Sequence, residues 1–222
     1  MWWYNRRQRR LVHAVLSLVV IAVLAALTGR RLWFDRSPAS GSSERFQVVA
    51  VIDGDTARLT GGDKLRLAHV DTPEKGEPLY AEATEMLRQL VEGKVLRLEH
   101  PKEHRDRYGR LLGFAYVDSM SIGVEMLRRG LAYVVLFDQS DYSVPQVASF
   151  LEAQREALKN RVGLHGVERH PEGFYLAAKT GLRFHRPGCR SAEGFLEGDH
   201  QRFSTREEAL YLGLAPCRNC RP

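Results

Sequence analysis

The feature that most constrains the fold is a set of five short runs, beginning at Phe46, in which apolar and polar residues tend to alternate. A period of two indicates strands with one buried face, and turn residues separate the runs. Five such strands favour a small barrel or sandwich. The runs are FQVVAVID, TARLT, KLRLAHV, VLRLEH and LLGFAYV.

Three segments show the apolar periodicity of helices, at residues 80–92, 121–130 and roughly 145–160. Pro145 suits the first turn of the third segment. Because helices follow the third and fifth strands, residues 45–166 are expected to form an α+β domain, a five-stranded β-barrel with three helices.

Residues 167–222 differ in character, with short strands, many turns and a helix expected at 204–214. Ser204 would cap this helix, with Glu207 three residues later. A unit of about fifty residues has too small an apolar core to be stable alone, so this small α+β module is expected to need a cross-link such as a bound metal or a disulfide.

The N-terminal segment, residues 1–36, predicts a membrane anchor. Residues 11–29 are almost continuously apolar, long enough to cross a bilayer, and flanked by aromatic residues. Four arginines precede this segment and two follow it, which favours a single-pass protein with a cytoplasmic N-terminus and an extracytoplasmic body. Secretion after signal cleavage is the alternative, although small residues are poorly placed before Arg30. Residues 37–44 indicate a flexible linker.

The net charge of +6 also belongs to this N-terminal segment. Residues 1–40 contain seven arginines and one aspartate, and the rest of the chain contains 26 basic and 26 acidic residues. A polyanionic substrate would therefore have to be bound by local arginines, because the body as a whole has no basic field.

Two acidic motifs, VIDGDT and RLAHVDTPE, end neighbouring strands of the expected barrel. Asp53, Asp55 and Asp71 would then converge on one rim, where mutual repulsion calls for a cation. Oxygen ligands without His or Cys select Ca²⁺ or Mg²⁺. Taken singly, each motif is more typical of a plain turn, and the hypothesis depends on the two occurring together.

Arginines accompany these acids. Arg66 stands five residues before Asp71, and DRYGR supplies Arg107, Tyr108 and Arg110 around a glycine. A cation, an acid able to act as a base and guanidinium groups suit phosphodiester hydrolysis, in which charge builds on phosphoryl oxygens.

In these motifs, and in the RGLAYV that follows a helix, residues 46 to about 165 resemble the staphylococcal nuclease (thermonuclease) family. The resemblance implies an OB-type barrel and Ca²⁺-dependent cleavage of DNA and RNA to 3′-phosphate ends. It implies Asp55 and Asp71 as calcium ligands, with Thr72 adding its carbonyl and Asp53 in the outer shell. The general base would be Glu74, the phosphate-binding arginines Arg66 and Arg110, and the substrate-contacting residues Tyr108 and Arg107.

The chain departs from the family at the position of a tyrosine that stacks on the nucleotide, where counting from Gly130 places Leu136. Stacking would be weaker or supplied by a neighbour such as Tyr133 or Phe137. Tyr133 is therefore expected among the substrate-binding residues.

All three cysteines lie in the last unit, where an odd number cannot pair off completely. Cys217 and Cys220 have the C-x₂-C spacing of a metal site, and Cys189 with His185 would complete a closed tetrahedral shell for structural zinc. His200 competes with His185 as the fourth ligand. A redox pair, or one disulfide with a free cysteine, is the alternative.

The pattern FHRPGC followed by FSTREEALYLGLAPCRNC resembles the metal-binding module of the Ada DNA-repair protein, with His185 in place of the first of four cysteines. The resemblance implies a zinc-held module with possible DNA-backbone contacts through Arg186, Arg190, Arg218 or Arg221.

The leading hypothesis is thus a membrane-tethered, Ca²⁺-dependent nuclease that hydrolyses DNA or RNA, with the lipid bilayer as a partner through residues 11–29. The alternative is a non-catalytic OB module that binds nucleic acid or protein. A zinc-dependent hydrolase would need an open zinc position, which the closed shell does not offer. No protein partner can be inferred from the sequence.

Overall fold

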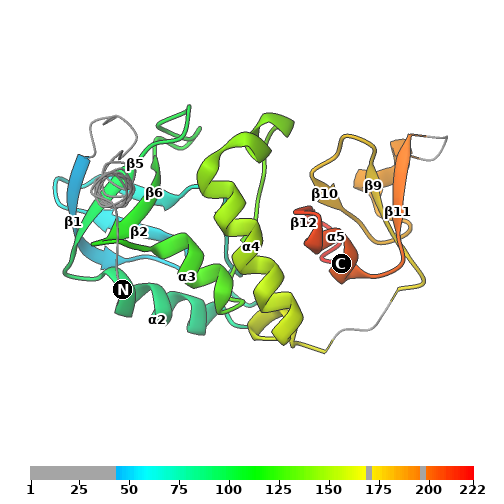
Figure 1. Cartoon of the computed structure of the whole chain (residues 1–222), viewed down its shortest axis with the longest axis horizontal. Helices are drawn as coiled ribbons and strands as arrows, with labels where there is room; N and C mark the ends of the chain where they lie inside the picture. Colours follow the sequence, from blue (N-terminus) through cyan, green and yellow to red (C-terminus); the bar gives the residue numbers. More distant parts are fainter. Residues whose placement is uncertain (1–43, 169–171, 196–198) are drawn as a thin grey trace, which may run out of the picture. The chain divides into compact units, whose positions relative to one another are not determined.

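The computed structural model describes residues 44–168, 172–195 and 199–222. These residues belong to one compact unit, Ser43–Pro222. Its element order can be followed in Figure 1, from the barrel strands through α4 to the C-terminal strands.

Five strands form a closed barrel. Their hydrogen-bonded order is β3-β2-β1-β5-β6, and β6 pairs back onto β3 in parallel, with Leu65 opposite Leu111. This confirms the predicted five-stranded barrel and fits an OB-type fold. The strands are β1 (Glu44–Val51), β2 (Thr56–Leu59), β3 (Lys64–Leu67), β5 (Val95–Glu99) and β6 (Leu111–Val117).

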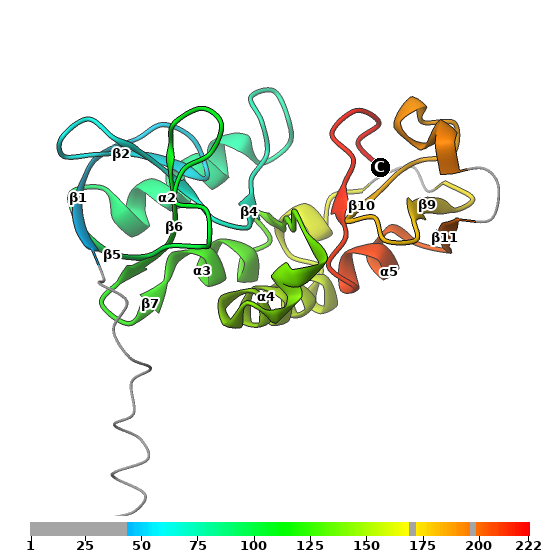
Figure 2. The same ribbon diagram turned by 90° about the horizontal axis from the view of Figure 1, so that it is seen from above.

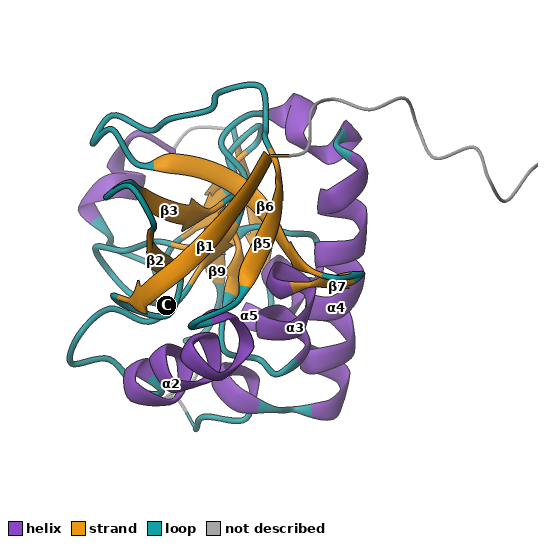
Figure 3. Ribbon diagram, turned by 90° about the vertical axis from the view of Figure 1, so that its left-hand side faces the viewer, coloured by secondary structure: helices purple, strands orange, loops and turns teal. Residues whose placement is uncertain are grey.

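The barrel closes because alternate residues of its strands are apolar and point inward. Leu65 and Leu67 of β3 are buried, as are Leu96 and Leu98 of β5, while the residues between them are more exposed. Figure 3 shows these strands wrapping around one another, with α2 beside one end. The short strand β7 (Met120–Ser121) extends the sheet from β6.

Three helices cover the barrel, as predicted. They are α2 (Tyr80–Val91), α3 (Ile122–Arg128) and α4 (Pro145–Asn160). Ala83, Leu87, Leu90 and Val91 form the buried face of α2. Pro145 occupies the first turn of α4, where its missing N–H costs no hydrogen bond.

A separate two-stranded ribbon joins the segment after β3 to the segment after α3. In it, β4 (Val70–Asp71) pairs with β8 (Tyr133–Val134), so the Asp71 backbone lies opposite Tyr133. Short 3₁₀ helices follow at η1 (Gln139–Ser143), η2 (Gly163–His165) and η3 (Arg190–Phe195). The ribbon fixes where Asp71 leaves the barrel.

The C-terminal elements form two small strand pairs and one helix around a separate apolar cluster that includes Phe184 and Leu210. The pairs are β9 (Tyr175–Ala178) with β11 (His200–Phe203), antiparallel, and β10 (Arg183–Phe184) with β12 (Ala215–Pro216), parallel. The helix is α5 (Arg206–Tyr211).

The capping prediction for α5 was wrong by one residue. Thr205, rather than Ser204, is the N-cap, and its Oγ1 accepts a hydrogen bond from the Glu208 N–H at 3.1 Å. Glu208 Oε2 accepts a hydrogen bond from the Ser204 N–H at 2.8 Å. The Thr205 and Glu208 side chains thus satisfy backbone N–H groups at the start of the helix. The helix ends at Tyr211 rather than at residue 214, because Gly213 takes a positive φ of 90°.

Helix α4 packs against α3 on one side and α5 on the other, as Figure 1 shows. Gln154, 1% exposed, connects the two sides: its Oε1 accepts from the Val134 N–H at 2.8 Å and its Nε2 donates to the Leu210 carbonyl at 2.7 Å. The predicted boundary between residues 166 and 167 stays a prediction.

The predicted membrane segment, residues 11–29, lies outside the described residues. Within the described ranges, every helix is too short or too polar to cross a bilayer.

Candidate functional site

The turn between β1 and β2 aims Asp55 into the protein. Asp53 Oδ1 accepts a hydrogen bond from the Asp55 N–H at 3.1 Å, and Thr56 Oγ1 donates to Asp55 Oδ1 at 2.9 Å. Gly54 is buried, and because it has no side chain this turn can lie close to the next loop. The DGD motif is therefore a turn, as its residue types predict, and it also delivers a buried carboxylate.

Thr72, on the segment that follows β4, joins Asp55 from the second motif. Its N–H and its Oγ1 both donate to Asp55 Oδ2, each at 3.2 Å. The two acidic motifs, separated along the chain by 17 residues at these positions, therefore meet at one carboxylate.

Arg66 lies between the two main acids. Its Nη1 is 2.6 Å from Asp55 Oδ2 and its Nη2 is 3.1 Å from Asp71 Oδ1. The strand register places Arg66 of β3 opposite Thr56 of β2, and Nη1 also donates to the Val70 carbonyl at 2.8 Å. One guanidinium thus brings the carboxylates of Asp55 and Asp71 together.

The electrostatics of Asp55 fit a site that takes up positive charge. Burial raises the pKa of Asp55 to about 6, against the lowering effect of Arg66, and the nearby charges of Asp53 and Asp71 raise the pKa further. An added cation would relieve this repulsion. Carboxylate and backbone carbonyl oxygens are the ligands that Ca²⁺ prefers, so the carboxylates of Asp55 and Asp71 and the carbonyl of Thr72 are of the type that the calcium role implied by the resemblance requires.

Arg110 reaches the same rim from the loop before β6. Its Nη1 lies 3.5 Å from Thr56 Oγ1, next to Asp55, and its Nε donates to Asp106 Oδ2 at 2.7 Å. Asp106 was not among the site residues predicted from the sequence. Burial opposes its ionisation, but hydrogen bonds from Arg110 and Tyr108 hold the pKa of Asp106 below its usual value. The D-x-x-G spacing of a turn was the available signal.

Tyr108 and Arg107 occupy the exposed end of this loop. The Tyr108 side chain is among the exposed large apolar groups, at 68% exposure, and its hydroxyl accepts a hydrogen bond from Arg107 Nη2 at 2.7 Å. Both side chains face solvent and are free to meet a ligand at the rim.

Glu74 is connected to Asp71 through Arg218, an arginine of the C-terminal loop. Its Oε1 lies 3.6 Å from Arg218 Nη1, and Arg218 also forms an ion pair with Asp71. The loop after β4 and the C-terminal loop, which carry these residues, rise side by side in Figure 2. Sequence had suggested Arg218 only as a DNA-backbone contact, and nothing in its local pattern indicates Asp71 as a partner.

Tyr133 is not among the side chains gathered at this rim. Its hydroxyl accepts a hydrogen bond from Arg206 Nη2 at 2.5 Å, and its ring lies 5.7 Å from that of His165. Phe137 is 74% exposed, with its ring 5.8 Å from that of His69. Of the two neighbours considered for base stacking, Phe137 is the more accessible.

A second cluster lies in the C-terminal elements. The ligand atoms of His185, Cys189, Cys217 and Cys220 all lie within 4.8 Å of one another, and three of the four residues are buried. The predicted set thus comes together without His200, and all three cysteines are free thiols. Three sulfurs and one imidazole at this spacing suit a tetrahedral zinc ion.

The two thiols of the C-x₂-C pair differ in acidity. Burial raises the pKa of Cys220 to about 12. Burial also disfavours the Cys217 thiolate, but hydrogen bonds from the backbone N–H groups of Cys220 and Asn219 hold the pKa of Cys217 below its usual value. Those N–H groups are already arranged to stabilise a thiolate, as a metal ligand requires.

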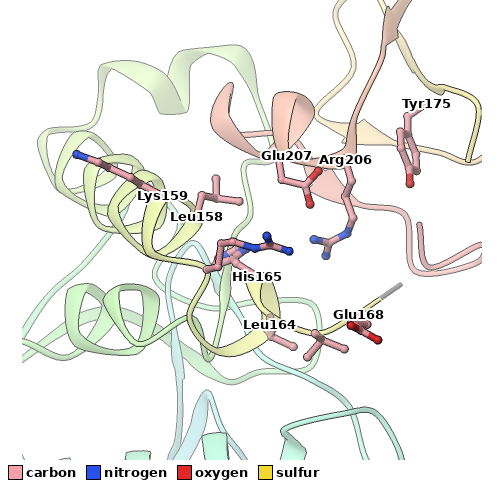
Figure 4. Close-up of a pocket in the computed structure, with 10 residues that line it drawn as sticks. Leu158, Lys159, Leu164, His165, Glu168, Tyr175, Arg206 and Glu207 are labelled. Atoms are coloured by element: carbon pink, nitrogen blue, oxygen red, sulfur yellow. The ribbon is translucent and has the colours of Figure 1, made fainter. Parts of the chain in front are cut away.

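A cavity of about 880 Å³ lies apart from both clusters, between the end of α4, η2 and the start of α5. Figure 4 shows His165, Arg206 and Glu207 on its walls. It is lined by none of the predicted calcium or zinc ligands, so the acidic rim remains the candidate active site.

Comparison with known proteins agrees with this geometry. The family described as "Staphylococcal nuclease homologue" matches residues 64–165, a range that includes Arg66, Asp71, Glu74 and Arg110 and begins after Asp55. An uncharacterized endonuclease of Escherichia coli is 34% identical over 116 residues, which are 50% of this chain and 74% of that protein.

Two further relatives extend the comparison. The thermonuclease of Staphylococcus hyicus is 24% identical over 157 residues, covering 67% of this chain and 92% of that protein. Endonuclease YncB of Bacillus subtilis is 41% identical over 111 residues, 44% of this chain and 53% of that protein. With its closed barrel and its acidic rim, the chain belongs to the staphylococcal nuclease family.

Proposed function

We propose that this protein is an endonuclease that hydrolyses phosphodiester bonds of DNA or RNA in a Ca²⁺-dependent reaction and leaves 3′-phosphate ends. The single observation that carries the proposal is the continuous set of side chains from Asp55 through Arg66 and Asp71 to Arg218 and Glu74. The named activities of the relatives support the reaction class.

The roles divide by position. Asp55 and Asp71 would hold the cation, with the Thr72 carbonyl as a further ligand and Asp53 supporting the turn through the Asp55 N–H. A bound Ca²⁺ would supply positive charge against the charge that develops on the phosphoryl oxygens.

The remaining residues would act on substrate and water. Glu74, with a side chain 64% exposed, is accessible to water and would accept a proton from it as the water oxygen bonds to phosphorus. The P–O5′ bond would break in the same displacement, so the phosphate stays on the 3′ end and the departing 5′-oxygen takes a proton from solvent. Arg66 and Arg110 would donate to phosphoryl oxygens, since their planar forks match that geometry. Arg107 and Tyr108 would contact the nucleic acid at the rim.

A cleavage assay tests this proposal. The full chain is incubated with single- and double-stranded DNA and RNA, with Ca²⁺ or with chelator, beside Glu74→Gln and Arg110→Ala. We expect Ca²⁺-dependent cleavage by the wild type and strong loss in both variants. Equal cleavage by all three proteins would overturn the mechanism, and binding without cleavage would favour the non-catalytic OB module.

We also propose that His185, Cys189, Cys217 and Cys220 hold one structural zinc ion. The four closely spaced ligand atoms support it, as does the small apolar cluster of these elements, which leaves them in need of a staple. The resemblance to the Ada-type module stays a prediction.

We further propose that residues 11–29 tether the nuclease to a membrane with the body outside the cytoplasm, on the basis of their length and apolar composition. Fractionation of cells that express the full chain, followed by protease treatment of intact spheroplasts, tests the tether and its orientation. Recovery of the uncleaved chain in the soluble fraction would contradict it.

A further inference from the structure

The C-terminal loop of residues 217–221, which we call the knuckle, carries two of the proposed zinc ligands and two arginines. An arginine follows each cysteine directly, Arg218 after Cys217 and Arg221 after Cys220. The Cys217 N–H donates to the Phe184 carbonyl at 2.9 Å, and the Arg221 N–H donates to the Cys217 carbonyl at 2.9 Å. The backbone of the knuckle is therefore held in place by hydrogen bonds, which fixes the points from which the two arginine side chains extend.

Both arginines of the knuckle contact the acidic loop of residues 71–77. Arg221 Nε lies 3.1 Å from Glu77 Oε1, and Glu77 Oε2 accepts a hydrogen bond from the Glu74 N–H at 2.8 Å. Arg218 contacts Asp71 and Glu74. The loop that carries the proposed base and the proposed calcium ligands Asp71 and Thr72 is thus bound by two arginine side chains of the same chain.

Arg218 engages both oxygens of Asp71. Its Nη2 donates to Oδ1, and its Nε lies 3.4 Å from Oδ2. Oδ1 also accepts from Arg66 Nη2 at 3.1 Å. The Asp71 carboxylate, whose side chain is 13% exposed, therefore has its charge already balanced by guanidinium groups.

The two arginines on Asp71 differ in how easily they can leave. The Arg66 side chain is 14% exposed and is also held by Asp55 and by the Val70 carbonyl. The Arg218 side chain is 55% exposed, and its described partners are Asp71 and Glu74. Solvent screens the exposed Arg218 guanidinium more than the less exposed Arg66 guanidinium, so Arg218 is the partner that an arriving cation can replace more readily.

We infer that Arg218 is a built-in counter-ion of Asp71 that a divalent cation must displace, so that the knuckle sets the cation affinity of the active site. This inference rests on the proposed cation-dependent function. A divalent ion beside Asp71 would repel the guanidinium and compete with it for the same two oxygens.

The test is calorimetric titration of Ca²⁺ into the full chain, purified in detergent and freed of calcium with a chelator that leaves zinc in place. We compare the wild type with Arg218→Ala, Arg218→Lys and the matched control Arg221→Ala, which removes the same charge from the knuckle but does not touch Asp71. Arg218→Ala is expected to lower the Kd for Ca²⁺ about tenfold, because it removes both a competing ion pair and a like-charge repulsion. Arg218→Lys should give an intermediate Kd, and Arg221→Ala a value near that of the wild type.

The outcomes are separable. An unchanged or higher Kd in Arg218→Ala, with clear binding by the wild type, would overturn the inference and leave the proposed function standing. A fall in Kd of the same size in Arg221→Ala would also overturn it, because the effect would then be one of general charge. Absence of Ca²⁺ binding in every protein would refute the calcium dependence itself.

Discussion

Gly54 lies directly against Thr72: a methyl group added at Gly54 would stand 2.6 Å from Thr72 Oγ1 and 2.8 Å from Thr72 Cβ. These distances are below ordinary contact, so the glycine is what allows the two acidic motifs to meet. Thr72 in turn donates two hydrogen bonds to Asp55, and a displaced Thr72 would release that carboxylate.

Gly54→Ala should therefore weaken Ca²⁺ binding and cleavage together. Crowding of this kind costs about 1 to 3 kcal/mol of unfolding free energy, so the Kd should be measured where urea titration shows the variant to be folded. Gly173→Ala is the matched control, since an added methyl there meets nothing within 4 Å. A Kd equal to that of the wild type in Gly54→Ala would contradict the role given to this contact.

The barrel was predictable because strand alternation is a local pattern, and the buried residues of β3 and β5 follow it. The pairing of Asp55 with Thr72 could be expected once both motifs were assigned to one rim. Two features could not be predicted. The contact between Arg218 and Asp71 spans 147 residues and has no periodic signal. The hydrogen bond between Tyr133 and Arg206 depends on how the C-terminal elements pack, which the sequence around Tyr133 does not indicate.

Glu74→Gln should separate chemistry from cation binding. If Glu74 is the general base, its loss should lower kcat by about 10² to 10⁴-fold, the usual contribution of a general base. The Kd for Ca²⁺ should change much less, because Glu74 is exposed and is not a proposed ligand. Single-turnover cleavage and calorimetry measure the two quantities.

The control for Glu74→Gln is Glu82→Gln, which removes an exposed charge from the first turn of α2 and is not one of the proposed calcium-binding or catalytic residues. It should cleave at the wild-type rate. Full activity in Glu74→Gln would assign the base to another group, and a large loss of Ca²⁺ affinity would make Glu74 a ligand.

Gln154→Leu should destabilise the whole unit. It would leave the buried Val134 N–H without the side-chain oxygen that it donates to, and the Leu210 carbonyl would keep only the hydrogen bond from the Gly213 N–H at 3.0 Å. One unsatisfied buried donor costs about 1 to 3 kcal/mol in unfolding free energy. Urea denaturation followed by far-UV circular dichroism measures this. Gln139→Leu is the control, because Gln139 is exposed and its bond to the Thr180 carbonyl can be replaced by water. Similar losses in the two variants would show that burial at Gln154 does not matter.

Zinc binding should depend on His185 and not on His200. His185 lies with the three cysteines and His200 does not, although the sequence alone allowed either histidine as the fourth ligand. Elemental analysis of the full chain purified under reducing conditions should find about one zinc per chain, as a closed four-ligand site holds. His185→Ala and Cys217→Ser should lose most of it, whereas His200→Ala should keep it. Because a closed site couples binding to folding, the two zinc-poor variants should also unfold at lower temperature than His200→Ala. Retention of zinc in His185→Ala together with its loss in His200→Ala would reverse the ligand assignment.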